Sequence, residues 1–174
     1  MPGRPSLTEP APAVPRRAPR AVLLAFLAGV LLIGAAAFSL HARPLPVDLT
    51  HPGPAAAAAC SELSRRLPAT VAGQARRAVD PASQRSAAWG ADPVVLRCGV
   101  GTPAALAPTS ELTTIDGVDW LPEQLDHGYR YTSVGRTAAV QVTVPDSYAP
   151  EADVLVDLSP AILAADPALP VATP

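Results

Sequence analysis

The longest apolar run in the chain covers residues 21–40, which read AVLLAFLAGVLLIGAAAFSL and carry no charge. Because a helix rises about 1.5 Å per residue, this run spans roughly the 30 Å hydrocarbon core of a bilayer. Arginines stand close before the run, whereas only His41 and Arg43 follow it closely. Positive flanks stay in the cytoplasm, so the pattern predicts a single-pass membrane helix with a cytoplasmic N-terminus and an exported remainder.

Cleavage of the run as a signal peptide is the alternative, since residues 35–37 offer a small-residue cleavage site. Both alternatives export the rest of the chain. Residues 57–60 resemble a lipid-attachment box, but such a box follows the apolar stretch directly, and here a proline-rich segment intervenes. This spacing excludes a lipoprotein.

Proline-rich segments divide the remaining chain. Residues 1–20 lack hydrophobic periodicity, which predicts a disordered cytoplasmic tail. Residues 41–54 predict an extended, polyproline-like spacer, and residues 166–174 predict a disordered C-terminal tail. The folded, exported domain is therefore expected at residues 55–165.

Local patterns in this domain predict two terminal helices with strands between them. Residues 55–67 are alanine-rich and stop at Pro68, whereas Pro150 begins a second helix that ends near Pro160 or shortly after it. Between them we expect a helical turn at 73–78, strands at 86–89 and 93–100, and hairpins at 112–121 and 130–144, the former around Asp116-Gly117. Helices at both ends favour an α+β fold with a small, mostly antiparallel sheet, preceded by one transmembrane helix.

Cys60 and Cys98 are the only cysteines in the chain. Because an exported domain folds in an oxidising compartment, the pair predicts a structural disulfide. A redox role is the alternative, but the two residues lack the C-x-x-C spacing of redox motifs. Two thiolates without histidines nearby in sequence also do not complete a zinc site, so no metal is expected.

Charge is distributed unevenly along the chain. Four arginines and one acid precede the apolar run, whereas eight arginines and fourteen acids follow Arg43. An acidic domain without a basic run has no electrostatic footprint for nucleic acid. The chain contains no lysine and no asparagine, which is typical of a GC-rich bacterial genome.

Three short segments carry a family resemblance: LRCGV at 96–100, GVDW at 117–120 and TSVGR at 132–136. Together with the N-terminal apolar run and Cys60, they resemble an actinobacterial family of membrane or secreted proteins that share a domain of unknown function. The resemblance covers roughly residues 60–162. It implies a location in the cell envelope and implies no activity.

Motifs of known enzyme classes are absent from the sequence, which has no G-x-S-x-G elbow, no H-E-x-x-H helix and no P-loop. No cofactor is therefore expected. A dense polar cluster lies around Trp120 and comprises Asp116, Asp119, Glu123, Asp126 and His127. We interpret it as a solvated loop, with a calcium-like cation site or an acid/base pair as alternatives.

Three arginines on predicted strands, Arg97, Arg130 and Arg136, are candidates for an anion-binding pocket with Asp119. Guanidinium groups fit carboxylate or phosphate oxygens. The alternative is pairing with the domain's own acids. Trp89 and Trp120 are expected in the core.

The sequence as a whole predicts a non-enzymatic, membrane-anchored, extracytoplasmic module of the bacterial cell envelope. Its expected partners are the lipid bilayer, through residues 21–40, and an envelope protein or cell-wall component. The alternative is a small-ligand-binding or enzymatic domain that uses the arginine pocket, and a third hypothesis is an enzyme that uses Asp126 and His127.

Overall fold

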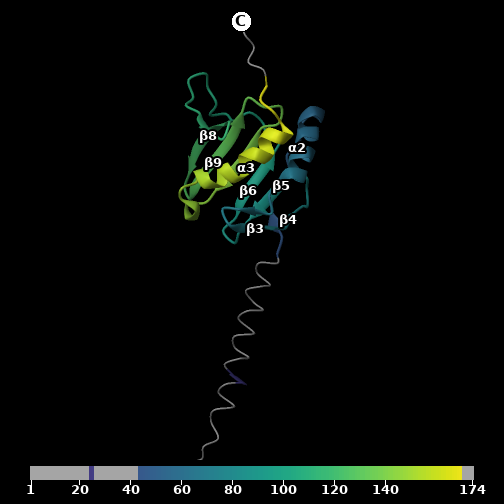
Figure 1. The fold of residues 1–174 in the computed structure, drawn as a ribbon, viewed down its shortest axis with the longest axis vertical. Coiled ribbons are helices and arrows are strands. Elements are labelled where there is room, and N and C mark those ends of the chain that lie inside the picture. Colours follow the sequence, from purple (N-terminus) through teal and green to yellow (C-terminus); the bar gives the residue numbers. More distant parts are fainter. Residues whose placement is uncertain (1–23, 26–42, 170–174) are drawn as a thin grey trace, which may run out of the picture. The chain divides into compact units, whose positions relative to one another are not determined.

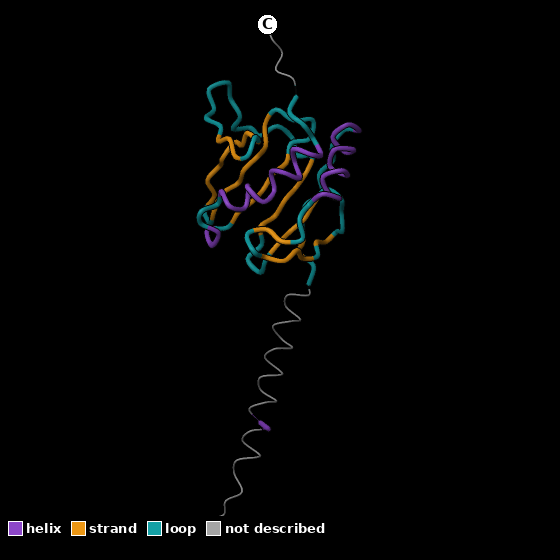
Figure 2. The backbone as a smooth tube through the Cα atoms, viewed as in Figure 1, coloured by secondary structure: helices purple, strands orange, loops and turns teal. Residues whose placement is uncertain are grey.

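The computed structural model describes residues 24–25 and 43–169, and residues 43–169 form one domain. The domain has an α+β fold with two helices and a mostly antiparallel sheet, as predicted (Figures 1 and 2). Eight strands form the main sheet in the order β2-β3-β5-β6-β10-β9-β8-β7, and β1 pairs in parallel with β4. The elements are β1 (Leu45–Pro46), α2 (Pro54–Arg66), β2 (Thr70–Val71), β3 (Gln74–Arg77), β4 (Val79–Asp80), β5 (Ser86–Trp89), β6 (Val94–Cys98), β7 (Thr113–Ile115), β8 (Val118–Leu125), β9 (Gly128–Val134), β10 (Val140–Val144), the 3-10 helix η1 (Asp146–Tyr148) and α3 (Ala152–Ala165).

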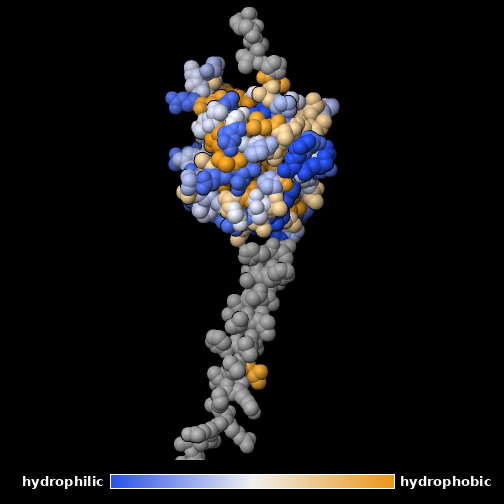
Figure 3. Space-filling view, in the orientation of Figure 1, coloured by the Kyte–Doolittle hydropathy of each residue, from blue (hydrophilic) through white to orange (hydrophobic). Residues whose placement is uncertain are grey.

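Both helices cover the same face of the sheet. They lie side by side in Figure 1, and both contribute to one apolar core. From the helices come Cys60, Leu63, Val154, Leu155, Leu158 and Ile162, and from the strands come Trp89, Leu96, Trp120, Val140, Val142 and Val144. The two tryptophans are fully buried, as predicted, and the indole N–H of Trp89 donates to the Pro68 carbonyl at 3.1 Å. The outer surface on this side mixes hydrophilic and hydrophobic areas (Figure 3).

The predicted hairpin around Asp116-Gly117 is confirmed. Both residues have positive φ, 45° and 76°, and Ile115 pairs with Val118. Positive φ at both central residues matches the right-handed twist of the flanking strands, and glycine adopts it without steric cost. The other predicted strands are present as β5, β6, β9 and β10.

The helical turn predicted at residues 73–78 is wrong, because Gln74–Arg77 forms strand β3. Alanine and arginine favour helix locally, but pairing with β2 and β5 overrides this weak preference. The turn that starts the strand is Ala72-Gly73, with φ of 47° and 72°. Alanine rarely adopts positive φ, so the sequence carried little signal for this hairpin.

Helix α3 contains Pro160 and ends five residues after it, at Ala165, in line with the predicted end near or shortly after this proline. Proline has no N–H to donate to the preceding turn and normally ends or kinks a helix. Here Ala161 and Ile162, which directly follow the proline, are buried in the core. Their burial favours continuation of the helix to Ala165, where the Asp166 N–H closes the last turn on the Ile162 carbonyl.

The predicted spacer is extended but attached to the domain. The Leu45 N–H donates to the Ala78 carbonyl, and the Val47 N–H donates to the Asp80 carbonyl, both at 2.9 Å. The buried Thr50 hydroxyl donates to the Cys98 carbonyl at 2.6 Å. The domain therefore includes most of residues 43–54, which corrects the prediction of a separate spacer there.

The start of the predicted C-terminal tail is also part of the domain. Asp166 is buried, and the Leu169 N–H donates to the Gly135 carbonyl at 2.9 Å. This corrects the prediction for residues 166–169.

The predicted disulfide between Cys60 and Cys98 is confirmed. It joins α2 to the end of β6, with 38 residues of sequence separation, and both cysteines are buried. A loop of this size corresponds to about 3–4 kcal/mol of stabilisation on a chain-entropy estimate. The disulfide therefore fastens the first helix to the sheet.

The predicted membrane span at residues 21–40 lies outside the described residues, except for Leu24 and Ala25. Of the helices that the structure describes, none combines the length and the hydropathy needed to cross a bilayer.

Candidate functional site

The face of the sheet opposite the helices is called the open face here. Side chains alternate between the two faces of a strand, so the core residues of each strand define which positions face away from the helices. On the four central strands and on β8, these positions carry the polar residues Ser86, Arg97, Gln141, Thr143, Arg130, Thr132, Asp119 and Glu123, together with the apolar residues Ala88, Val95, Val134, Leu121 and Leu125.

Strand register brings four of these polar residues into one row. Arg97 pairs with Ser86 on one side and with Gln141 on the other, and Gln141 pairs with Thr132. Arg130 lies two residues from Thr132 on the same strand and pairs with Thr143. Strands are about 4.8 Å apart, so Arg97 and Thr132 start about 10 Å apart.

Of the eight buried polar side-chain atoms without a hydrogen-bond partner within residues 43–169, four belong to Ser86, Arg97, Arg130 and Thr132 on the open face, and the others belong to Arg77, Arg85, Trp120 and Arg136. Thr132 is fully buried and Ser86 is 5% exposed, yet neither hydroxyl has a hydrogen-bond partner within residues 43–169. The same holds for the buried Nε atoms of Arg97 and Arg130. An unsatisfied buried polar group costs about 1–3 kcal/mol, and native proteins contain few of them. Several on one face therefore mark it as a candidate site.

The two open-face arginines have no carboxylate partner within the part of the chain that the structure describes. Ion pairs there join only Glu62 to Arg65 and Arg66, on the surface of α2. Hydrogen bonds from these arginines lower the pKa of the Glu62 carboxyl group, and the bond from Arg65 has the larger effect. Glu123 stands opposite Arg130 in the sheet register but forms no ion pair with it.

The predicted anion pocket is corrected in composition. Arg97 and Arg130 share the open face, but Arg136 lies in the β9–β10 loop and is 9% exposed. Its guanidinium donates to the carbonyls of Asp166, at 2.5 Å, and Gly117, at 3.0 Å. Asp119 shares the open face, where it stands opposite Val134. It is exposed and accepts a hydrogen bond from Thr114 at 2.6 Å. Arg136 thus fastens the end of α3, and it does not join a common pocket.

Thr132 and Ser86 were not singled out from the sequence. The two-residue period of a strand places Thr132 on the same face as Arg130, which was a usable signal. Ser86 and Gln141 reach Arg97 only through the register of β5, β6 and β10. No pattern within a single strand of the sequence predicts that register.

A hollow of about 380 Å³ adjoins the open face. The sheet contributes Val95, Arg97 and Thr143, and the other side consists of the β1 segment and β4, including Asp48 and Asp80. The segment that precedes α2 therefore borders the polar row at Arg97.

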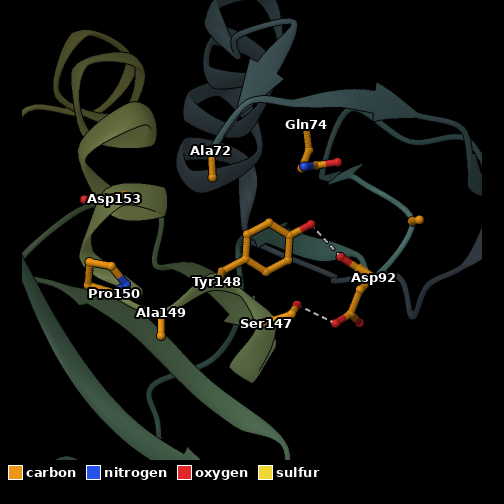
Figure 4. Close-up of a pocket in the computed structure, with 9 residues that line it drawn as sticks. Ala72, Gln74, Asp92, Ser147, Tyr148, Ala149, Pro150 and Asp153 are labelled. Atoms are coloured by element: carbon orange, nitrogen blue, oxygen red, sulfur yellow. Dashed lines mark hydrogen bonds between the residues drawn. The ribbon is translucent and has the colours of Figure 1, made fainter.

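A second hollow, of about 440 Å³, lies between the β2–β3 turn, the β5–β6 loop, η1 and the start of α3 (Figure 4). Tyr148 points across it and donates to the Asp92 carbonyl at 2.7 Å, while Ser147 donates to the Asp92 carboxylate at 2.6 Å. Burial, and then the charge of Asp92, raises the pKa of Tyr148 above its usual 10.0. A side chain at Gly90 would collide with the Tyr148 hydroxyl, so glycine there permits this packing.

The acidic cluster predicted around Trp120 is dispersed. Asp116 lies in the turn before β8, whereas Asp126 and His127 form the turn after it, and all three are exposed. An eight-residue strand of about 3.4 Å per residue separates the two turns by over about 20 Å. Within residues 43–169 no group of three His, Cys, Asp or Glu side chains is arranged to hold a metal ion.

Comparison with known proteins identifies the family. No curated protein and no solved structure matches the chain. A family model does match residues 21–171, a region that includes both the apolar run and the whole described domain. The chain therefore belongs to the family described as Protein of unknown function (DUF3515).

Proposed function

We propose that the protein is a non-enzymatic, membrane-anchored module of an actinobacterial cell envelope, with its domain on the extracytoplasmic side. The Cys60–Cys98 disulfide is the observation that carries this proposal, because such bonds persist in oxidising compartments and are rare in the cytosol. The uncharged run at 21–40 supports it, since it is long enough for a bilayer span. This run also lies within the region that the family model matches.

A binding role, rather than catalysis, is supported by the state of the nucleophilic and acid/base side chains. In the hollow of Figure 4 the hydroxyls of Ser147 and Tyr148 donate to the carboxylate and carbonyl of Asp92, so they stabilise the packing of η1. Asp126 and His127 occupy an exposed two-residue turn. Neither arrangement presents an activated nucleophile with a base and an orienting partner. The partner we propose is an envelope protein or a cell-wall component.

The attachment of residues 45–50 to the domain sharpens this proposal. Only residues 41–44 separate the end of the predicted span from Leu45, the first residue paired in the sheet. Four residues reach at most about 14 Å when extended. The domain we propose is therefore tethered closely and has little reach into the envelope.

Fractionation of the full chain in a bacterial host tests the proposal. We expect the protein in the membrane fraction after an alkaline wash, without free thiols until a reductant is added, and accessible to protease added outside the inner membrane. Replacing Leu27 and Leu31 with arginine should release it from membranes, because arginine near the centre of a span costs about 2.5–3.5 kcal/mol. The matched change of both leucines to alanine should leave it there.

Two results would contradict the proposal. One is a wild-type chain found in the cytosol with two alkylatable thiols. The other is a chain resistant to external protease in cells whose outer barriers are permeabilised, because the domain would then face the cytoplasm.

A further inference from the structure

The open face has the properties of a ligand-binding site. These properties do not depend on whether the chain is anchored in a membrane. Its two arginines lie against the sheet, since their Nε atoms are buried, rather than extending fully into solvent. Around them stand the hydroxyls of Ser86 and Thr132, which are buried and unpartnered within residues 43–169. These groups come from three strands, β5, β6 and β9, that the sheet holds rigidly in register.

The chemistry of these groups selects the class of ligand. Arginine Nε–H groups only donate, and hydroxyls donate or accept, so the complementary ligand presents several acceptor oxygens. A guanidinium group matches carboxylate and phosphate oxygens. Ser86, Arg97, Arg130 and Thr132 come from three strands, and a tetrahedral phosphate group accepts hydrogen bonds in more directions than a planar carboxylate does.

Neighbouring carboxylates limit the charge of that ligand. Glu123 stands beside Arg130, and Asp48 and Asp80 line the hollow beside Arg97. These negative charges disfavour the binding of a doubly negative ligand group. A phosphodiester carries a single negative charge, so these carboxylates repel it less than they repel a doubly charged phosphomonoester.

We propose that the open face binds a phosphodiester group between Arg97 and Arg130, with Ser86 and Thr132 as further hydrogen-bond partners. The group is borne either by a phospholipid headgroup or by a soluble molecule. Gln141, which lies between Arg97 and Thr132 in the row, is placed to contact the same ligand.

Titration of the full chain in dodecyl maltoside, a detergent without phosphate, tests this site. For a soluble source, glycerophosphoglycerol is added. For a lipid source, phosphatidylglycerol is added to the same micelles, with a monoacylglycerol, which has no phosphate, as the control. Binding is read as a rise in Tm of the domain and, for the soluble probe, as heat on titration.

The variants are Arg97→Gln with Arg130→Gln, and separately Thr132→Val. We expect the double variant to lower the affinity at least about tenfold, since hydrogen bonds to charged groups are lost. The matched control is Arg65→Gln with Arg66→Gln, which removes the same charge from the exposed surface of α2 and should retain wild-type binding. Thr132→Val removes a hydroxyl without changing charge, so it tests the site if the double variant is poorly folded.

Binding in either arm that is lost in the open-face variants and kept in the control supports the site. The arm in which binding occurs identifies whether the phosphodiester comes from a lipid or from a soluble molecule. The proposal is overturned if neither probe raises the Tm of the wild type. It is also overturned if both double variants bind equally weakly, because the effect would then be general electrostatic attraction. Failure of the anchoring proposal would not affect the soluble arm.

Discussion

The two faces of the main sheet are made by the same strands, yet they differ in whether their buried polar atoms form hydrogen bonds. On the helix-covered face, the Ser133 hydroxyl accepts from the Val140 N–H at 2.8 Å, and the Trp89 indole donates to Pro68. The Trp120 indole N–H is the exception there. On the open face, the polar atoms of Ser86 and Thr132 lack partners within residues 43–169.

This contrast separates stability from binding. The helix-covered face buries the large apolar side chains and the disulfide, which are the main sources of folding free energy. The open face contributes polar groups whose burial costs free energy when they have no partner. Proteins tolerate such costs mainly where function requires them. Substitutions on alternate residues of one strand can therefore separate the two roles.

The largest effect is expected from Trp120→Ala on the helix-covered face of β8. Trp120 is fully buried in the core, and removing a buried aromatic side chain costs about 3–5 kcal/mol. Urea unfolding followed by circular dichroism measures the change. Glu123→Ala on the open face of the same strand is the control and should shift the unfolding free energy by less than about 0.5 kcal/mol. Equal losses in both variants would show that the two faces do not differ in stability.

Removal of the disulfide should have the next largest effect. Changing Cys60 and Cys98 to serine should lower the unfolding free energy by about 3–4 kcal/mol, because the unfolded chain regains the freedom of the closed loop. The reduced wild-type protein is the control and should match the variant closely. If reduction leaves the urea midpoint of the wild type unchanged, the bond does not fasten α2 to the sheet in the way described.

Two neighbouring hydroxyls on β9 give a sharper test of the comparison. Ser133→Ala removes the acceptor of the buried Val140 N–H and should cost about 1–3 kcal/mol. Thr132→Val, on the open face, replaces an unpartnered hydroxyl with a methyl group of similar size and should be neutral or slightly stabilising. The unfolding free energies of the two variants, measured in the absence of ligand, test whether the two substitutions differ in this way. A loss at Thr132 as large as that at Ser133 would mean that the open-face hydroxyl is satisfied in solution.

Local signals predicted the elements that depend on a few adjacent residues. The Asp116-Gly117 turn fixes its hairpin through backbone preference alone, and the paired cysteines follow from their number and the expected compartment. Residues 74–77 were mispredicted because their conformation depends on β5, which is distant in sequence. The burial of Ile162 likewise outweighed the local effect of Pro160.

The candidate site was only partly predictable for the same reason. Arg97 and Arg130 were recognised as strand residues, but their shared face depends on β10 lying between β6 and β9. That order joins segments far apart in the chain, so no window of sequence contains it. Arg136 was wrongly grouped with them because its loop position, bonded to the Asp166 carbonyl, is set by the end of α3.

The smallest effect is expected at high pH, from Tyr131 on the helix-covered face. Its burial raises the pKa of the Tyr131 hydroxyl above the usual 10.0, and the charges of Glu151 and Tyr129 raise it further. A raised folded-state pKa means that the neutral form is favoured in the folded protein. The associated stability is fully present below pH 10.0 and is lost as the pH rises through the folded-state pKa.

Tyr131→Phe should therefore leave stability at neutral pH nearly unchanged and reduce its decline above pH 10.0. Urea unfolding at neutral and alkaline pH measures this difference, with tyrosinate absorbance as the readout of ionisation. Thr132→Val, one residue away on the open face, is the control and should show the wild-type decline, because it removes no ionisable group. A decline in Tyr131→Phe as steep as that of the wild type would place the alkaline sensitivity elsewhere, with Tyr148 as the next group to replace, since burial also raises its pKa.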